Sequence, residues 1–364
     1  MEQCYCFGAL RRRMIHIFVV LHFLSCGLIA CCCGKKSNSE YSVADGGNDS
    51  SAPDTGIIWD SGTDGQVGEN CEHPPVVAAC AGGFCRIPAG CFTLGSPATE
   101  PCRSPSAESQ VRIRLTHMFD ISEHEVTQAE WHDIGFLKPI GPSDCPECPI
   151  TYVDWFEALA YANALSANEG RAICYDLFCC EGTVGEGCQV GEPGCGETTF
   201  RCDCDLARYS PPQECPGYRL PTVAEWQYAA RAGTTTATYR GDLTAAGPDC
   251  EGDPVLDLIA WHCGNTSEEQ PVGMKSPNDW GLFDMLGSAW EWVDTCYSGG
   301  PLGEPGEILV DPVGPTGTPV RSIVGGSWRE PPCHARAAMM PGFPPETRGA
   351  GLGFRIVRTV VDEP

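Results

Sequence analysis

One stretch of the chain carries apolar residues at helical spacing. Between Trp155 and Leu165 they recur at i, i+3 and i+4, with Asp154 directly before them and Gly170 after them. Asp is a favoured N-cap and Gly a favoured terminator of helices. The pattern therefore predicts a helix that begins after Asp154 and ends at Gly170.

Two capping boxes predict two further helices. In Thr127-Gln-Ala-Glu130 and in Thr222-Val-Ala-Glu225, a Thr is followed three residues later by a Glu. This spacing lets each side chain accept a backbone N–H group in the first turn of a helix. We expect a short helix after the first box, and a longer one from Val223 to Ala232 with Gly233 as its C-cap.

Short strands account for most of the remaining pattern. Val111 to Leu115 alternates apolar and basic residues, as a half-buried strand does. Two strands between Phe84 and Gly95 flank a Pro-Ala-Gly turn. Further strands are expected at 118–126, 322–324 and 353–360. The sequence predicts one irregular α+β domain with few helices, many short strands and long ordered loops.

Composition limits the class of protein. The chain has 364 residues, of which 42% are hydrophobic, enough for a large core. It carries 23 Lys and Arg against 48 Asp and Glu, which gives a net charge of −25. A nucleic-acid-binding surface needs an excess of Lys and Arg, so nucleic acid is excluded as the expected partner.

The N-terminal region predicts export. Three arginines at 11–13 precede an apolar stretch from Met14 to Ala30, so residues 1–30 are expected to be a signal peptide. The stretch ends in Leu28-Ile-Ala-Cys31, which resembles the cleavage box of bacterial lipoproteins. The resemblance implies cleavage before Cys31, a lipid on its thiol, and an exported protein anchored in the bacterial cell envelope, at the outer membrane or cell surface. An uncleaved anchor is the alternative.

The composition changes again near residue 70. Residues 31–70 are rich in Ser, Gly, Asp and Asn and poor in apolar residues. Such a segment buries too little surface to offset the entropy of ordering it, so we expect a flexible acidic tether. Residues 71–364 are expected to form the folded domain.

Cysteine is the outlier of the composition. The chain has 25 cysteines, 19 of them from Cys71 onward, and in an exported domain such cysteines are expected to form disulfides. Cys145 and Cys148 have metal or redox spacing, but a disulfide is favoured there too. Eight cysteines lie between Cys174 and Cys215 among many glycines. This segment is expected to be a disulfide-stapled insertion rather than a core element.

A series of short motifs indicates the family. In chain order they occupy 87–96, 124–128, 149–155, 218–231, 271–273, 277–285, 287–292, 325–328 and 353–355. Together they resemble the formylglycine-generating enzyme family, the sulfatase-modifying-factor domain, over about residues 82–359. The resemblance implies an irregular C-type-lectin-like fold with little regular secondary structure. It also implies oxidation of a sulfatase cysteine to an aldehyde, with oxygen and copper.

The cysteines that carry this activity in the family are not both present. Active members bind copper through two cysteines five residues apart, just after a Gly-Gly-Ser-aromatic motif. In this chain Cys333 is the only cysteine between Trp328 and Phe354. Cu(I) prefers paired thiolates, so we expect no copper and no copper-dependent oxidation. Cys333 is a catalytic candidate without its partner; we expect it in a disulfide, with Cys296 as a plausible mate, and pointing away from His334.

The resemblance also implies a calcium site. In the family, a Gly-x-Ala-Trp-Glu segment binds structural Ca²⁺ through backbone carbonyls and the Glu carboxylate. The matching residues are Gly287, Ala289 and Glu291, with Ser288 in place of the family's Asn. Oxygen ligands suit Ca²⁺. The alternative is that Glu291 is a buried carboxylate held by backbone amides or by an arginine. Arg219, Arg231 and Arg355 are expected to be buried ion-pair anchors.

Two functions follow from this reading. The first is a membrane-tethered, non-catalytic module that binds a peptide, protein or glycan. The alternative is an oxidoreductase of the formylglycine-generating type that acts on protein cysteine. A deep cleft beside Ser327 and Arg355 would favour the enzyme, and a flat face built from loops would favour binding.

Overall fold

The computed structural model describes residues 71–139, 141, 143–186, 200–202, 209–244, 247, 249–304, 306–315 and 318–360. These residues all belong to one compact unit of the chain. The expected signal peptide, tether and lipidated Cys31 lie outside these residues. Within them, no helix has the length and apolar character needed to cross a bilayer.

The α-helices of the described chain begin where the capping residues predict. They are α1 (Gln128–Asp133), α2 (Trp155–Asn168) and α3 (Val223–Arg231). In each helix the N-cap side chain accepts the backbone N–H of a Glu at N3, and that Glu accepts the N–H of the N-cap residue. Short 3₁₀ turns are found at Pro212–Glu214 (η1), Leu256–Leu258 (η2) and Pro332–His334 (η3).

The C-terminal end of α3 differs by one residue from the prediction. The C-cap is Ala232, which adopts a left-handed conformation with φ 43°, and Gly233 follows with φ 86°. A Cβ on Gly233 would lie 3.0 Å from Val76 Cγ2. The glycine suits this position, because its φ of 86° is one that other residues rarely adopt and a Cβ would lie tightly against Val76.

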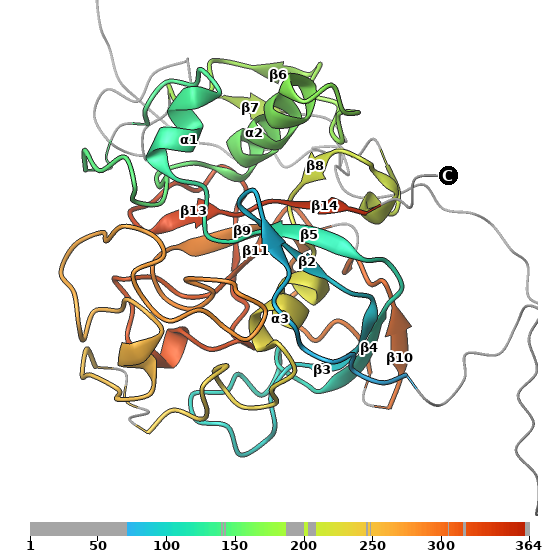
Figure 1. Cartoon of the computed structure of the whole chain (residues 1–364), viewed down its shortest axis with the longest axis vertical. Helices are drawn as coiled ribbons and strands as arrows, with labels where there is room; N and C mark the ends of the chain where they lie inside the picture. Colours follow the sequence, from blue (N-terminus) through green and yellow to red (C-terminus); the bar gives the residue numbers. More distant parts are fainter. Residues whose placement is uncertain are drawn as a thin grey trace, which may run out of the picture. The chain divides into compact units, whose positions relative to one another are not determined.

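The strands form three sheets and a two-stranded ribbon within the described residues (Figure 1). The first sheet has the order β1 (Cys80–Ala81), β2 (Phe84–Ile87), β5 (Phe119–Ser122), β14 (Val357–Thr359) and β8 (Tyr218–Arg219). The second has the order β10 (Ile308–Val310), β4 (Val111–Leu115) and β3 (Gly90–Leu94). The third has the order β12 (Gly342–Phe343), β11 (Arg321–Val324), β9 (Trp290–Cys296) and β13 (Leu352–Phe354). The ribbon pairs β6 (Cys180–Glu181) with β7 (Arg201–Cys202).

Two segments that the sequence presents as units are divided between sheets. β2 and β3 flank the expected Pro-Ala-Gly turn, yet β2 pairs with β5 while β3 pairs with β4. The expected strand at 353–360 is in fact two strands: β13 runs parallel to β9, and β14 runs antiparallel to β5. The chain changes sheets at Arg355 and Ile356, so Arg355 lies at a junction between two sheets.

The strand β9 was missed by the sequence analysis. It is the second longest element of the C-terminal half and pairs with both β11 and β13. Six of its seven residues are buried, because neighbours cover both faces of the strand. A strand buried on both faces shows no alternation of apolar and polar residues, which is why periodicity did not reveal it.

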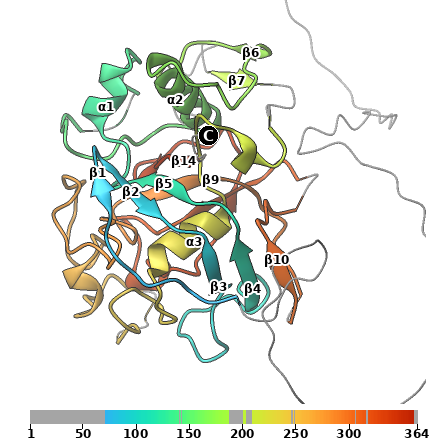
Figure 2. The ribbon, with the colours of Figure 1, turned by 45° about the vertical axis from the view of Figure 1, so that its right-hand side comes forward.

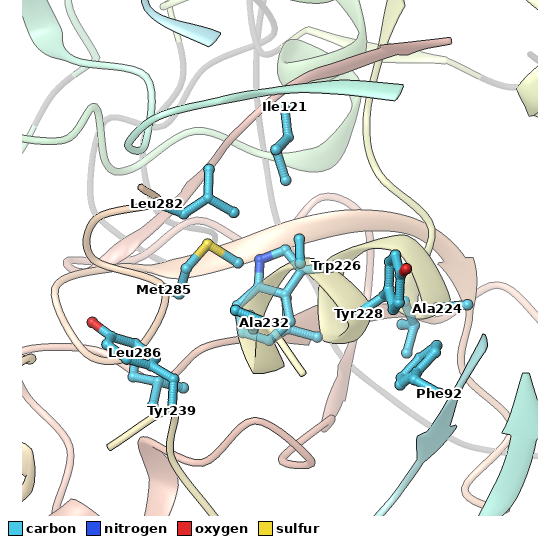
Figure 3. Packing of buried hydrophobic residues seen from close by; sticks show 14 of the residues in the cluster. Phe92, Ile121, Ala224, Trp226, Tyr228, Ala232, Tyr239, Leu282, Met285 and Leu286 are labelled. Atoms are coloured by element: carbon cyan, nitrogen blue, oxygen red, sulfur yellow. The ribbon is translucent and has the colours of Figure 1, made fainter. Parts of the chain in front are cut away.

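Two hydrophobic clusters form the core. One surrounds α3, which lies next to β3 and β4 (Figure 2). Figure 3 shows Trp226 beside Met285, and Tyr228 beside Phe92, with 5.3 Å between the ring centroids of the latter pair. The second cluster surrounds α2 and includes Trp131, stacked on a tyrosine of that helix.

Disulfides support the irregular parts of the domain, as expected. The described bonds are Cys71–Cys91, Cys80–Cys85, Cys102–Cys333, Cys145–Cys148, Cys174–Cys215, Cys180–Cys202 and Cys250–Cys263. The bond between Cys174 and Cys215 joins the two ends of the cysteine-rich insertion. The Cys145–Cys148 pair is a disulfide, as favoured from the sequence.

The buried arginines mostly act as expected. Arg219 forms a two-point ion pair with Glu225, at 2.8 and 2.7 Å. Arg231 differs, since it donates hydrogen bonds to the carbonyl oxygens of Gly95 and Thr236 rather than to a carboxylate. A guanidinium donates five N–H groups and can satisfy either kind of acceptor, so sequence alone does not distinguish the two roles.

Candidate functional site

Three buried carboxylates and one arginine meet where the sheets join. Glu125 comes from the loop between β5 and α1, Asp284 from the loop before β9, and Glu291 from β9 itself. Arg355 lies between β13 and β14. The side chains of Glu125, Glu291 and Arg355 are 0% exposed and that of Asp284 is 1% exposed. We call these four residues the carboxylate cluster.

Glu291 is held by Arg355, as one of the two alternatives predicted. Arg355 Nε lies 2.8 Å from both carboxylate oxygens of Glu291. Trp226 Nε1 donates to the same carboxylate at 2.6 Å. The remaining Arg355 nitrogens donate to the carbonyl oxygens of Ser122 and Phe283, at 3.2 and 3.0 Å. Arg355 is therefore a buried ion-pair anchor that ties β9 to the junction of two sheets.

Glu125 and Asp284 each keep one oxygen without a partner. Glu125 Oε1 accepts the N–H of Ala289 at 3.1 Å, and Asp284 Oδ2 accepts the N–H of Gly273 at 2.6 Å. Glu125 Oε2 and Asp284 Oδ1 are buried and have no hydrogen-bond partner among the described residues. An unmade bond to a buried charged oxygen is costly, so this pair of oxygens marks a place for a cation or for protons.

The pKa values of the three carboxyl groups are raised, which also favours a bound cation or bound protons. Burial raises the pKa of the Glu125 carboxyl well above its usual range, and the charge of Asp284 raises it further. Burial likewise raises the pKa of Asp284 and of Glu291, although Arg355 lowers both. Three carboxylates face one guanidinium, so a fully ionised cluster would carry an excess of negative charge in a dry environment.

The residues predicted to bind calcium lie in this region. The N–H of Gly287 donates to Gly325, the N–H of Ala289 donates to Glu125, and the carboxylate of Glu291 faces Arg355. The carboxylates with open oxygens are Glu125 and Asp284, which the sequence analysis did not single out. Both lie inside the quoted family motifs, but 159 residues separate them along the chain and no local pattern connects them. Oxygen is the donor that Ca²⁺ prefers, and the open oxygens of this region belong to Glu125 and Asp284.

Cys333 forms a disulfide with Cys102, so the suggested mate Cys296 is wrong. The two cysteines are 231 residues apart in sequence. Arg336 brings their segments together: it forms ion pairs with Glu100 and Glu108 at 2.6 and 2.8 Å. Cys296 is instead buried at the end of β9. The pairing depends on contacts between distant loops, which the sequence does not display.

His334 contacts Glu330 rather than Cys333, and the segment that carries both residues is a 3₁₀ turn and not extended as expected. Its Nδ1 lies 2.9 Å from Glu330 Oε2, and its ring centroid lies 6.2 Å from that of Trp290. The hydrogen bond from His334 lowers the pKa of the Glu330 carboxyl. The imidazole is therefore oriented by a carboxylate and is not placed to activate the sulfur of Cys333.

The surroundings of Ser327 and Arg355 bear on the expected cleft. Ser327 is 1% exposed and Arg355 is 0% exposed. Two pockets lined by described residues lie elsewhere, one beside α1 and one on the first sheet. Neither is lined by Ser327 or by a residue of the carboxylate cluster. Both residues are thus structural parts of the interior rather than walls of these pockets.

Comparison with known proteins gives the family. The model of the sulfatase-modifying factor enzyme 1-like domain matches residues 74–360. The formylglycine-generating enzyme of Mycobacterium tuberculosis is 34% identical over 299 residues, covering 74% of this chain and 96% of that protein. The chaperone protein LppX of Paenibacillus barcinonensis is 26% identical over 270 residues, covering 70% and 85% of the two chains.

Solved structures show the same fold. The variable protein 1 of Treponema denticola superposes with a TM-score of 0.56 at 23% identity, covering 76% of this chain and 95% of the other. PvdO from Pseudomonas aeruginosa gives a TM-score of 0.52 at 22% identity, covering 76% and 94%. The expected irregular α+β fold is confirmed by these similarities. Since the family model spans most of the chain, the chain belongs to the family of sulfatase-modifying factor enzyme 1-like domains.

Proposed function

We propose that this protein is a non-catalytic binding protein, anchored to the cell envelope, that uses a sulfatase-modifying-factor domain as its scaffold. The observation that carries the proposal is the disulfide between Cys333 and Cys102. Cu(I) is bound by thiolates, and a sulfur in a disulfide is not a thiolate. Cys333 therefore supplies neither ligand of a two-thiolate copper site.

The neighbours of Cys333 support a structural role for it. Arg336 is fully buried and its ion pairs with Glu100 and Glu108 hold the loop that carries Cys102. Arg336 also donates to the carbonyl oxygen of Cys102 at 2.9 Å. The disulfide joins two loops that Arg336 already holds together. It stabilises the fold mainly by restricting the freedom of the unfolded chain.

Anchoring and binding form the second part of the proposal. The lipoprotein box at Cys31 and the acidic segment 31–70 would hold the domain away from a membrane surface. A relative named as a chaperone protein supports a binding role. The partner we propose is a peptide, protein or glycan outside the cytoplasm, recognised by loops held on a rigid scaffold.

We also propose a structural calcium ion at the carboxylate cluster. Glu125 and Asp284 would supply carboxylate oxygens that lack hydrogen-bond partners. Gly287 and Ala289 would contribute backbone carbonyl oxygens as the family resemblance implies, while Glu291, the third residue of that motif, stays paired with Arg355. The ion would supply positive charge where three carboxylates share one arginine. Its role in this proposal is to hold the loop before β9 against the loop after β5, with no part in a reaction.

An assay for aldehyde formation tests the part of the proposal that says the protein is not a catalyst. The full chain is incubated with a cysteine-containing sulfatase peptide, oxygen and added copper, and the peptide is analysed by mass spectrometry. We expect no product, while the mycobacterial relative run in parallel serves as the positive control. Sustained turnover would overturn the proposal, and loss of that turnover in Cys333→Ser would assign it to Cys333.

A further inference from the structure

We propose that a pocket on the outer face of the first sheet binds the C-terminal carboxylate of a peptide. The pocket has a volume of about 400 Å³ and is lined by Ala79, Ala81, Phe84, Arg86, Asp120 and Arg358. It lies on strands β1, β2, β5 and β14, apart from the carboxylate cluster and from Cys333. Figure 2 shows β1 and β2 at one edge of this sheet.

The charged residues of the pocket form one row across the sheet. Arg86 on β2 lies opposite Asp120 on β5, Asp120 lies opposite Arg358 on β14, and Arg358 lies opposite Tyr218 on β8. Side chains that are directly opposite in neighbouring strands project from the same face. Antiparallel pairing therefore brings together two arginines that are 272 residues apart in the sequence.

Asp120 binds both arginines without using all of their donors. Arg86 donates through Nε and Nη2, at 2.9 and 3.3 Å, and Arg358 donates through Nε and Nη2, at 3.0 and 2.9 Å. The two arginines lower the pKa of Asp120, so this carboxylate is ionised at neutral pH. Each guanidinium carries five N–H groups. The row thus retains N–H donors and one net positive charge in a chain whose net charge is −25.

The donors are accessible, and an apolar wall stands next to them. The side chains of Arg86 and Arg358 are 50% and 24% exposed, whereas that of Asp120 is 6% exposed. The Arg358 guanidinium lies 5.6 Å from the Phe84 ring centroid and 5.7 Å from that of Tyr218, so aromatic rings hold it in place. Ala79, Ala81 and Phe84 provide the apolar side of the pocket.

This combination selects the ligand. Arginine pairs with a planar carboxylate through two parallel hydrogen bonds. One net positive charge matches a single carboxylate better than a phosphate dianion. The apolar wall fits a small hydrophobic side chain directly beside the carboxylate, as in the last residue of a peptide.

The edge of the sheet offers main-chain groups for the rest of the peptide. β1 pairs with β2 on one side only, and Cys80 and Ala81 are both exposed. The N–H of Arg86 donates to the carbonyl oxygen of Ala79 at 3.0 Å, so Cys80 and Cys85 form the next, non-hydrogen-bonded pair. The N–H and C=O of Cys80 therefore point away from β2. An extended peptide could pair with this edge while its end lies in the pocket.

The inference rests on the proposed binding role and gives it a partner class. We would measure binding by isothermal titration calorimetry on the full chain in detergent. The ligand is a hexapeptide that ends in Val and has no charged side chains. The peptide is supplied as the free acid and as the C-terminal amide. We expect the acid to bind about tenfold more tightly than the amide, because a hydrogen bond to a charged group is lost in the amide.

Variants locate the site. Arg86→Gln is expected to weaken binding of the acid about tenfold and to remove the preference over the amide. Arg86→Lys keeps the positive charge but not the planar guanidinium, which can form two parallel hydrogen bonds. Its affinity for the acid should therefore lie between that of the wild type and that of Arg86→Gln. Arg240→Gln, at an exposed arginine in a turn, is the matched control and should change nothing. Thermal unfolding of each variant shows whether the fold is kept.

Several results would overturn the inference. They are equal binding of acid and amide, no binding of either, or an Arg86→Gln variant that binds the acid as tightly as the wild type does. Binding of octanoate at Arg86 without binding of the peptide would also reject it and assign the pocket to a fatty carboxylate. The outcome is separate from the copper assay, since aldehyde formation tests Cys333 and the acid–amide comparison tests Arg86.

Discussion

Two of the arginine–carboxylate systems of this domain differ in which charge is in excess. In the carboxylate cluster, Arg355 faces three carboxylates and all four residues are buried. On the outer face of the first sheet, Arg86 and Arg358 share the single carboxylate of Asp120 and remain partly exposed. The interior system therefore lacks positive charge, whereas the surface system has N–H donors to spare.

The difference shows that burial, and not residue type, decides what such a system can do. A charge taken out of water is costly unless it is matched, so the interior system needs a cation or bound protons. A charge at the surface is screened by water, so an unmatched arginine there costs little and can serve a ligand. Under the two proposals, the same two residue types would hold a metal ion in one place and an organic anion in the other.

Removing the interior arginine is expected to have the largest effect. Arg355→Met leaves Glu291 buried without its cation, and breaking a buried ion pair from one side costs about 3–5 kcal/mol. Urea unfolding of the full chain measures the loss. Arg86→Gln is the matched change at the surface and should cost less than about 1 kcal/mol. Similar losses in the two variants would contradict the comparison.

Calcium is expected to have the next largest effect. If the cluster binds Ca²⁺, an excess of one hundred times the dissociation constant stabilises the fold by about 2.7 kcal/mol. The midpoint of thermal unfolding, recorded with EDTA and then with increasing Ca²⁺, measures this gain. Glu125→Gln should abolish it, and Glu268→Gln, an exposed control, should not. A wild-type midpoint that Ca²⁺ leaves unchanged would reject the proposed ion.

The pH dependence of stability should have opposite signs in the two systems. Burial raises the pKa of Glu125, so the calcium-free folded state binds more protons than the unfolded chain above the usual carboxyl range. Stability is then lost as the pH rises above about 4.3, by about 1.4 kcal/mol for each unit between the two pKa values. The arginines lower the pKa of Asp120, so its contribution is present above the usual Asp range and is lost as the pH falls.

Urea unfolding between pH 4 and 8 in EDTA measures the first of these effects. The decline toward neutral pH should be smaller in Glu125→Gln than in the wild type, because the substituted amide does not titrate. Asp120→Asn should keep the decline of the wild type. A decline of equal size in all three proteins would show that Glu125 is not its source.

The smallest effect is expected from Asp120→Asn. Because Arg86 and Arg358 stay solvated, the loss of their carboxylate should cost about 1 kcal/mol or less in urea unfolding. The same change raises the net charge of the row from one to two, so it should strengthen binding of the acid peptide while leaving that of the amide unchanged. Weaker binding of the acid would mean that Asp120 itself contacts the ligand.

The helices of this protein could be predicted almost to the residue. Thr127, Asp154 and Thr222 cap helices whose third residue is a Glu, and both partners lie within four residues of each other. Interactions between residues so close along the chain can be recognised from the sequence alone. The strand β9 could not be predicted in this way, because burial on both faces removes the alternation that marks a strand.

The site shows the same division. The sequence identified Glu291 and offered an arginine as one possible partner, and the structure places Arg355 there. It did not identify Glu125 or Asp284, whose importance comes from oxygens left without partners after folding. A missing hydrogen bond is a property of the packed interior and has no counterpart in a linear motif.

By itself, the sequence determined the family, the residues where the helices begin and the reliance on disulfides. It also showed that no second cysteine lies close to Cys333 along the chain. Each of these depends on residue identity or on short spacing. Only the tertiary structure decided that Cys333 pairs with Cys102, that Arg355 faces three carboxylates and that Arg86 lies in a row with Arg358. These relations join segments that lie far apart in the sequence, and the free energy that selects them comes from burial and pairing when the segments meet.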